Sequence, residues 1–291
     1  IGTGDWSSDV CLPISVAVYA SGDGADWTYQ LGLTDRATMG TTLNALARQK
    51  TGIWDRGSAL QVKFTGGSVA GVTREALLSG RNAAAIGNPE TNSWEVFQFR
   101  DAELISDDTW ALSMRLRGQR GTDGMVPQSW PMGSTVVLLD DALEQVPGAS
   151  TWRGVERRYR MGPARKAVDH ASYVETTHTC LGMGLRPYRP VHIKSTNVGG
   201  DIAVAWVRQT RIDGDLWSDF DVPLGEASER YAVRVVKDGV TLRDATVAAP
   251  NWIYTAANQA SDGVIAPYEI EIAQVSDRFG PGLYGKVTIN D

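Results

Sequence analysis

The sequence predicts a mainly β protein: a β-rich first region followed by an immunoglobulin-like sandwich. Short runs of alternating apolar and polar residues recur along the chain and are bounded by Gly, Pro, Asn and Asp, a pattern typical of sandwiches and barrels. Glycine is frequent, with 31 of 291 residues, which suits many turns between short strands. Only residues 41–49 and 74–79 have a helical pattern, and both segments are too short to organise a fold.

The first half of the chain contains four segments with strand-like patterns. They are residues 14–19, 60–64, 94–117 and 134–139. Residues 94–117 alternate on both sides of Asp107 and Asp108, so we expect one long β-hairpin there.

The two helical segments differ in their end signals. Thr73 is a good N-cap and Gly80 a good stop for a helix over residues 74–79. Residues 41–49 place Leu43 and Leu46 on one helical face and make a weaker candidate.

The last hundred residues predict a sandwich of seven strands, the number in an immunoglobulin-like domain. The expected strands are residues 191–195, 201–208, 229–237, 242–247, 252–256, 268–273 and 285–289. Asp238 and Gly239 form a hairpin turn between two of them. Pro187 and Pro190 make a stiff entry to this region, so we expect a domain boundary before it.

Charge divides the chain into three parts. Residues 1–149 carry a net charge of −6, residues 150–190 carry +5, and residues 191–291 carry −5. We therefore expect a β-rich region over 1–149, a basic connector over 150–190 and the sandwich over 191–291.

The basic connector is a candidate interface. Its candidate residues are Arg157, Arg158, Arg160, Arg165 and Lys166. An electrostatic seam, within the chain or between subunits, explains the charge better than nucleic acid, which needs a wider basic field. We expect no nucleic-acid partner.

Several function classes lack their signatures. No apolar run reaches 18 residues, so no membrane-spanning segment is expected. Cys11 and Cys180 lie far apart and favour two buried free thiols over a disulfide or a zinc site. The sequence has no G-x-S-x-G and no phosphate loop, and none of His170, His178 and His192 lies beside a nucleophile in a recognisable pattern. We expect neither catalysis nor a cofactor.

An acidic segment near residue 215 is a weak metal candidate. Its carboxylates belong to Asp213, Asp215, Asp219 and Asp221. Closely spaced aspartates can supply several calcium ligands, but the spacing does not match an EF-hand. A solvated acidic loop is the alternative.

Three tryptophans in loop-like segments are candidates for binding: Trp217, Trp27 and Trp152. A tryptophan on a loop can stack on a sugar ring or anchor a protein partner. The alternative is that these rings cap the open ends of β-domains.

Residues 191–291 resemble a fibronectin type III domain. Trp206 lies in the second expected strand, Tyr231 opens a middle strand, and the strand that begins at Tyr268 is followed by a Gly-rich turn over 279–282. The resemblance implies a β-sandwich.

Nearly the whole chain, about residues 10–291, also resembles phage tail proteins of the gene transfer agent type. The signature is residues 116–123, Leu-Arg-Gly-Gln-Arg-Gly-Thr-Asp. Further landmarks are residues 54–56, 82–87, 94–96, 159–163, 184–188, 210–215 and 276–280. In such proteins a glycosidase-related TIM-barrel region lies upstream, so we expect this chain to be the C-terminal portion of a longer protein.

The resemblance implies a structural component of a phage or gene transfer agent tail tip or baseplate. Its partners would be other tail and baseplate proteins, further copies in a homotrimer, and a glycan or protein on the host cell surface. Its location would be the virion, after synthesis in the bacterial cytoplasm. One alternative is a carbohydrate-binding or adhesin module associated with a glycan-degrading protein; another is a depolymerase with a catalytic Asp or Glu.

Overall fold

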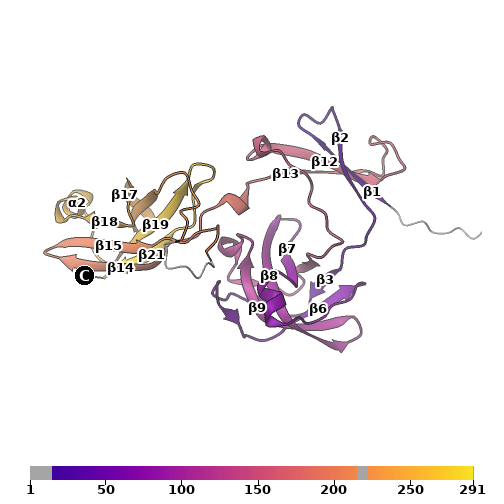
Figure 1. Cartoon of the computed structure of the whole chain (residues 1–291), viewed down its shortest axis with the longest axis horizontal. Coiled ribbons are helices and arrows are strands. Elements are labelled where there is room, and N and C mark those ends of the chain that lie inside the picture. Colours follow the sequence, from indigo (N-terminus) through magenta and orange to yellow (C-terminus); the bar gives the residue numbers. More distant parts are fainter. Residues whose placement is uncertain (1–14, 215–221, 291) are drawn as a thin grey trace, which may run out of the picture. The chain divides into compact units, whose positions relative to one another are not determined.

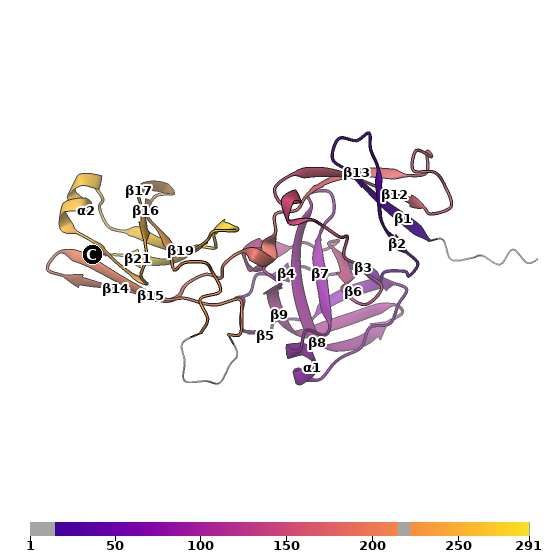
Figure 2. The ribbon, with the colours of Figure 1, turned by 45° about the horizontal axis from the view of Figure 1, so that its top comes forward.

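The computed structural model describes residues 15–214 and 222–290. The chain divides into two compact units, Ile1–Leu181 and Gly182–Asp291 (Figures 1 and 2). Strands dominate both units, which confirms the mainly β prediction. No helix in the described ranges is long and apolar enough to cross a membrane.

A closed barrel of six antiparallel strands forms the larger part of the first unit. The strands follow the order β9-β6-β3-β11-β7-β8, and β8 pairs with β9 to close the ring. Their bounds are β3 (Met39–Thr42), β6 (Leu60–Thr65), β7 (Ala83–Asn88), β8 (Ser93–Ser106), β9 (Thr109–Gln119) and β11 (Thr135–Leu138). In β6 the side chains of Leu60, Val62 and Phe64 are buried and their neighbours exposed, as the alternation predicts.

Short elements flank the barrel. They are β4 (Leu46–Ala47), β5 (Trp54–Asp55), α1 (Arg74–Leu78), η1 (Asp123–Met125) and β10 (Ser129–Trp130). The expected hairpin over 94–117 is confirmed by β8 and β9. The expected helix is also confirmed: α1 lies beside β8 (Figure 2), and its N-cap Thr73 accepts a hydrogen bond from the Ala76 backbone N–H at 3.2 Å.

The helix expected over residues 41–49 was wrong. Residues 39–42 form β3, which pairs with β6 and β11, and residues 46–47 form β4, which pairs with β10. Leu46 is buried while Leu43 is exposed, so the two leucines do not share one apolar helical face. Ladder hydrogen bonds to distant strands override the weak local helical pattern.

A four-stranded antiparallel sheet, of order β13-β12-β1-β2, completes the first unit (Figure 1). Its strands are β1 (Val16–Ser21), β2 (Thr28–Leu33), β12 (Glu156–Pro163) and β13 (Val174–Thr179). The basic stretch over 150–190 was expected to be a connector, and this expectation is corrected. Most of the stretch belongs to the first unit, because β12 pairs with β1 from Val16↔Pro163 to Ser21↔Arg158.

The second unit is a sandwich of two antiparallel sheets. One sheet has the order β14-β15-β18, and the other contains β17, β16 and β19, with β20 and β21 paired to β19 (Figure 1). The strands are β14 (Val191–Val198), β15 (Asp201–Val207), β16 (Tyr231–Lys237), β17 (Val240–Val247), β18 (Asn251–Tyr254), β19 (Tyr268–Ser276), β20 (Gly280–Pro281) and β21 (Gly285–Ile289). The seven expected strands are confirmed. Without the two-residue β20, three strands lie opposite four, which is the arrangement of a fibronectin type III-like sandwich.

The core of the sandwich contains the predicted aromatic residues. Trp206 is buried and meets Tyr231 edge to face, with ring centroids 5.1 Å apart. The sequence did not predict α2 (Ala256–Asp262), which has Thr255 as N-cap and Gly263 as its left-handed C-cap. The turn η3 (Met183–Leu185) precedes the first strand.

Candidate functional site

A buried ionic cluster lies inside the barrel, where β5, β8 and β9 meet. Glu95 on β8 receives hydrogen bonds from Arg117 on β9, with Nε 2.6 Å from Oε1 and Nη2 2.8 Å from Oε2. The Trp130 indole N–H donates to Oε2 at 2.7 Å, and the Gly118 backbone N–H donates to Oε1 at 3.1 Å. The Glu95 and Arg117 side chains are both 0% exposed.

A second carboxylate extends this cluster. Asp55 on β5 lies 3.0 Å from Arg115 Nε and 3.4 Å from Arg117 Nη1. Burial by itself raises the pKa of Asp55. The hydrogen bonds from Arg115 and Gly57 and the positive charges of Arg115 and Arg117 outweigh burial and lower this pKa below its usual range.

The cluster links β5, β8 and β9, and none of its ionised groups is exposed to solvent. Each acid is paired with an arginine, and Arg115 and Arg117 also donate to the backbone carbonyls of Leu112 and Ala47. The sequence-based prediction gave Asp55, Glu95 and Arg117 no role beyond the segments that carry the family resemblance, and it did not include Arg115. The spacing of the two arginines at positions 115 and 117 is the sequence signal for the cluster, because residues two apart lie on one face of a strand.

The candidate arginines and tryptophans of the sequence come together at the four-stranded sheet. Arg157 lies over the Trp152 ring, with Cζ 4.0 Å from the ring centroid. Arg160 lies over Trp27, with Cζ 4.3 Å from the centroid. Both rings are half-buried. A guanidinium on an indole face is a cation–π contact worth about 0.5–1 kcal/mol at an exposed site.

Local turns position both tryptophans. Trp152 ends η2 (Ser150–Trp152), which precedes β12. Trp27 follows the β1–β2 turn, where the Asp23 carboxylate accepts hydrogen bonds from the Ala25 and Asp26 backbone N–H groups and the Ser21 hydroxyl. These hydrogen bonds lower the pKa of Asp23 to about 2.

The five candidate basic residues differ in their partners. Arg158 and Arg160 share Glu175 of β13, at 3.4 and 3.0 Å. Arg165 and Lys166 are exposed in the β12–β13 loop and form no ion pair with a described residue. Arg157 likewise has no ion pair within the described part of the chain. Within the described part of the chain, the ion pairs of these five residues are therefore local and go to Glu175, and Arg157, Arg165 and Lys166 form none.

Most of the acidic segment lies outside the described residues, including Asp215, Asp219, Asp221 and the candidate Trp217. Asp213 is described and exposed, with a left-handed φ of 48°. In the described ranges, no group of three or more His, Cys, Asp or Glu is arranged to hold a metal.

The cysteine and histidine predictions have mixed outcomes. Cys180 is free but exposed, which corrects the expectation of a buried thiol, because it follows the edge strand β13. Cys11 lies outside the described residues. His170 Nδ1 lies 2.8 Å from the Ser172 hydroxyl within one exposed turn, and His178 Nδ1 lies 3.4 Å from Asn92 Nδ2.

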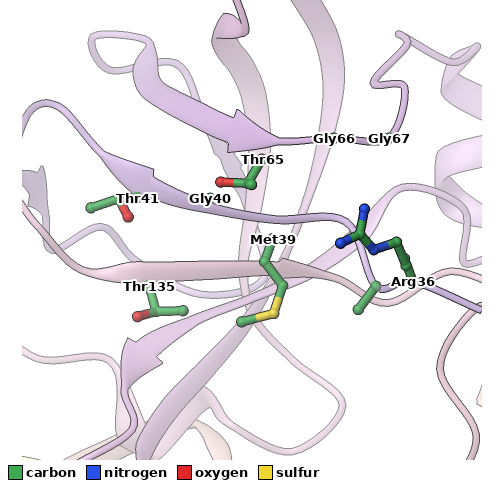
Figure 3. Close-up of a pocket in the computed structure, with 9 residues that line it drawn as sticks. Arg36, Met39, Gly40, Thr41, Thr65, Gly66, Gly67 and Thr135 are labelled. Carbon is green, nitrogen blue, oxygen red and sulfur yellow. The ribbon is translucent and has the colours of Figure 1, made fainter. Parts of the chain in front are cut away.

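A pocket lies on the outer face of the barrel (Figure 3). Figure 3 shows Met39 and Thr41 of β3, Thr65 of β6 and Thr135 of β11 around it, with Arg36 at one side. The pocket offers one guanidinium, three hydroxyls and a thioether. These groups can bind a polar ligand, but the lining residues contain no acid and no histidine for proton transfer.

Comparison with known proteins gives one family match. Residues 37–137 match the family described as Rcc01698-like, C-terminal. This range contains the whole buried ionic cluster. No curated protein matches the chain.

Two of the solved structures that the chain resembles are distant matches. The rat CD45 extracellular region, domains d3–d4, is 11% identical and covers 53% of this chain and 72% of its own, with a TM-score of 0.27. The central fibronectin-III array of RIM-binding protein is 11% identical and covers 96% of this chain and 88% of its own, with a TM-score of 0.25.

Proposed function

We propose that this chain is a structural, non-enzymatic component of the tail tip or baseplate of a phage or gene transfer agent. The observation that carries the proposal is the buried ionic cluster. Residues 116–123 resemble the tail-protein signature, and residues 54–56 and 94–96 are two of its further landmarks. Arg117 of the signature is bonded inside the barrel to Asp55 and Glu95 of these landmarks. A signature made of buried, paired charges serves to specify a fold, which suits a building block of a particle.

Tail assembly and host attachment would use different surfaces of the chain. In this proposal the barrel belongs to the framework shared with other tail and baseplate proteins. The sandwich and the β12–β13 hairpin would supply the contacts with the host. Three copies in a homotrimer would combine weak individual contacts into strong attachment on a repetitive cell surface, because later contacts become intramolecular.

Immunogold electron microscopy tests the location. An epitope inserted in the exposed β16–β17 turn at Asp238 and Gly239 would label the full-length protein within its native particle. We expect gold at the end of the tail. Unlabelled particles together with free secreted protein would instead favour the carbohydrate-binding or adhesin alternative.

A matched pair of variants tests the structural role. Glu95→Gln should reduce the number of particles with a complete tail tip, because it disrupts the buried cluster. Glu90→Gln makes the same chemical change at an exposed position of the β7–β8 turn and should assemble normally. Normal assembly of the Glu95→Gln particles would contradict the role given to the cluster.

A further inference from the structure

The two faces of the β12–β13 hairpin carry different charges. Side chains alternate along a strand, so the register between the two strands assigns each residue to a face. One face carries Glu156, Arg158, Arg160 and Glu175, whose charges sum to zero. The other face, which we name the Arg157 face, carries Arg157, Tyr159, Met161, Val174, Thr176 and His178. It contains a cation and no acid.

Arg157 is the unusual residue of this face. Its guanidinium lies over Trp152, and it forms no hydrogen bond or ion pair with a described residue. Its Nε atom is buried and has no acceptor. Buried donors are nearly always bonded, so an unbonded one marks a guanidinium whose hydrogen-bonding capacity is not used by the described residues. The neighbouring Arg158 and Arg160 have an acceptor in Glu175, so the lack is specific to the Arg157 face.

The stack on Trp152 leaves Arg157 ready to bind an anion. The five N–H groups of a guanidinium lie in its plane, so contact through the flat face does not use the Nη donors at its edge, whereas the Nε donor is buried. A carboxylate accepts two of these donors in parallel, which is the strong bidentate geometry. His178 lies directly opposite Arg157 on β13. Its Nδ1 lies near Asn92, so Nε2 is the ring nitrogen that it can offer to a ligand.

The rest of the face suits a sugar. Tyr159 is a half-buried aromatic residue, and Thr176 is exposed. The hydroxyls of both form no hydrogen bond with a described residue, so they remain free for the hydroxyls of a ligand. An aromatic ring also packs on the apolar face of a pyranose.

We infer that the Arg157 face binds an acidic saccharide of a cell surface, with the sugar carboxylate held by Arg157. This inference rests on the proposed role in host attachment and names the ligand class for it. In an acidic sugar, the carboxylate would pair with the Arg157 guanidinium, the sugar hydroxyls would bond to the hydroxyls of the face, and the apolar side of the ring would pack on Tyr159. An acidic protein segment has carboxylates without ring hydroxyls around them, and a nucleic acid has no carboxylate, so both serve as competitors in the test.

Calorimetric titration of the full chain with polygalacturonate, polysialic acid and alginate tests the inference. We expect saturable binding to at least one of them. For polygalacturonate, the methyl-esterified polymer is a matched control, because it keeps the sugar and removes the charge. This polymer should bind at least about tenfold more weakly.

Two adjacent arginines supply matched variants. Arg157→Gln should weaken binding by about tenfold or more, since it removes a charge-assisted pair. Arg158→Gln makes the same change on the opposite face and should stay within about twofold. Arg157→Lys keeps the charge but loses the bidentate fork, so its binding should fall between these variants. An unchanged circular dichroism spectrum and a Tm within about 4 °C of the parent would show that each variant is folded, because the lost stack on Trp152 is worth only about 0.5–1 kcal/mol.

Several results would overturn the inference. They are the absence of saturable binding to all three polymers, equal weakening by Arg157→Gln and Arg158→Gln, and equal or tighter binding of polyglutamate or oligothymidine. The immunogold experiment uses no saccharide, so such a failure leaves the proposed location to be judged by its own test.

Discussion

Replacing Glu95 by glutamine tests the buried ionic cluster most directly. The side chains have nearly the same shape, so the substitution removes the negative charge without creating a cavity. In the native barrel, the Glu95 carboxylate accepts four hydrogen bonds, from Arg117 Nε and Nη2, the Trp130 indole and the Gly118 backbone. The glutamine keeps one acceptor oxygen and turns an N–H donor toward groups that are themselves donors.

The expected cost follows from the burial of both partners. Arg117 is 0% exposed, and its remaining carboxylate is Asp55, 3.4 Å away and shared with Arg115. Removing one partner of a buried ion pair costs about 3–5 kcal/mol. For a unit of this size, that loss lowers the midpoint of its thermal transition by roughly 10 °C.

Differential scanning calorimetry with separate transitions for the two units measures this effect. The sandwich transition should not move, which makes it an internal control, while Glu90→Gln should leave both transitions within about 0.5 kcal/mol of the parent. Arg117→Met, alone and combined with Glu95→Gln, completes a double-mutant cycle. The double variant should cost at least about 1 kcal/mol less than the sum of the single variants. A cost below about 1 kcal/mol for Glu95→Gln would refute the reasoning.

Three further predictions concern individual contacts. Thr73→Ala removes the N-cap of α1 and should lower the stability of the first unit by about 1 kcal/mol in denaturant titration, while Thr73→Ser should restore most of it. Gly118 and Gly52 both have left-handed φ values, but a Cβ on Gly118 meets atoms 2.6 Å away, whereas one on Gly52 meets nothing within 4 Å. Gly118→Ala should therefore cost at least about 1 kcal/mol more than Gly52→Ala by the same titration. The hydrogen bonds from Arg243 lower the pKa of Asp262 in the folded sandwich. The unfolded chain therefore binds the proton more tightly, so this contribution is full above pH of about 4 and is lost as the pH falls further. Asp262→Asn should flatten the acid dependence of the Tm of the sandwich, and an unchanged slope would contradict the assignment.

The sandwich could be predicted strand by strand because each of its sheets has one buried face. In β16, for example, Tyr231, Val233 and Val235 are buried and alternate with less buried residues. The signal is local, and it does not depend on knowing which strands pair. The long β8–β9 hairpin was predictable for a similar reason, since its two strands are joined by a short turn.

The four-stranded sheet could not be predicted in the same way. The sequence of β12 begins Glu-Arg-Arg-Tyr-Arg, which places charges on both faces and gives no apolar alternation. Its strand character comes from pairing with β1, as in Ser21↔Arg158, a partner far away in the sequence. The stack of Arg157 on Trp152 depends on this pairing and on η2. Composition alone therefore identified these residues as candidates but did not show which arginine had a partner.

The buried residues Arg115 and Arg117 differ from Arg157 in a way that requires separate tests of the family resemblance and of ligand binding. Arg115 and Arg117 lie within residues 37–137, which match the family, and both are buried and bonded to acids. Arg157 lies outside that range, is half-buried, and has an unbonded donor. A variant in the buried cluster destabilises the barrel, so a loss of the proposed host attachment in such a variant would carry no information about a ligand. Arg157→Gln should lower the Tm by no more than about 4 °C, leave the proposed tail-tip assembly intact and weaken only the binding of the saccharide. If Arg157→Gln gives a stable particle that no longer binds the acidic saccharide, the proposed attachment belongs to the β12–β13 hairpin and not to residues 116–123.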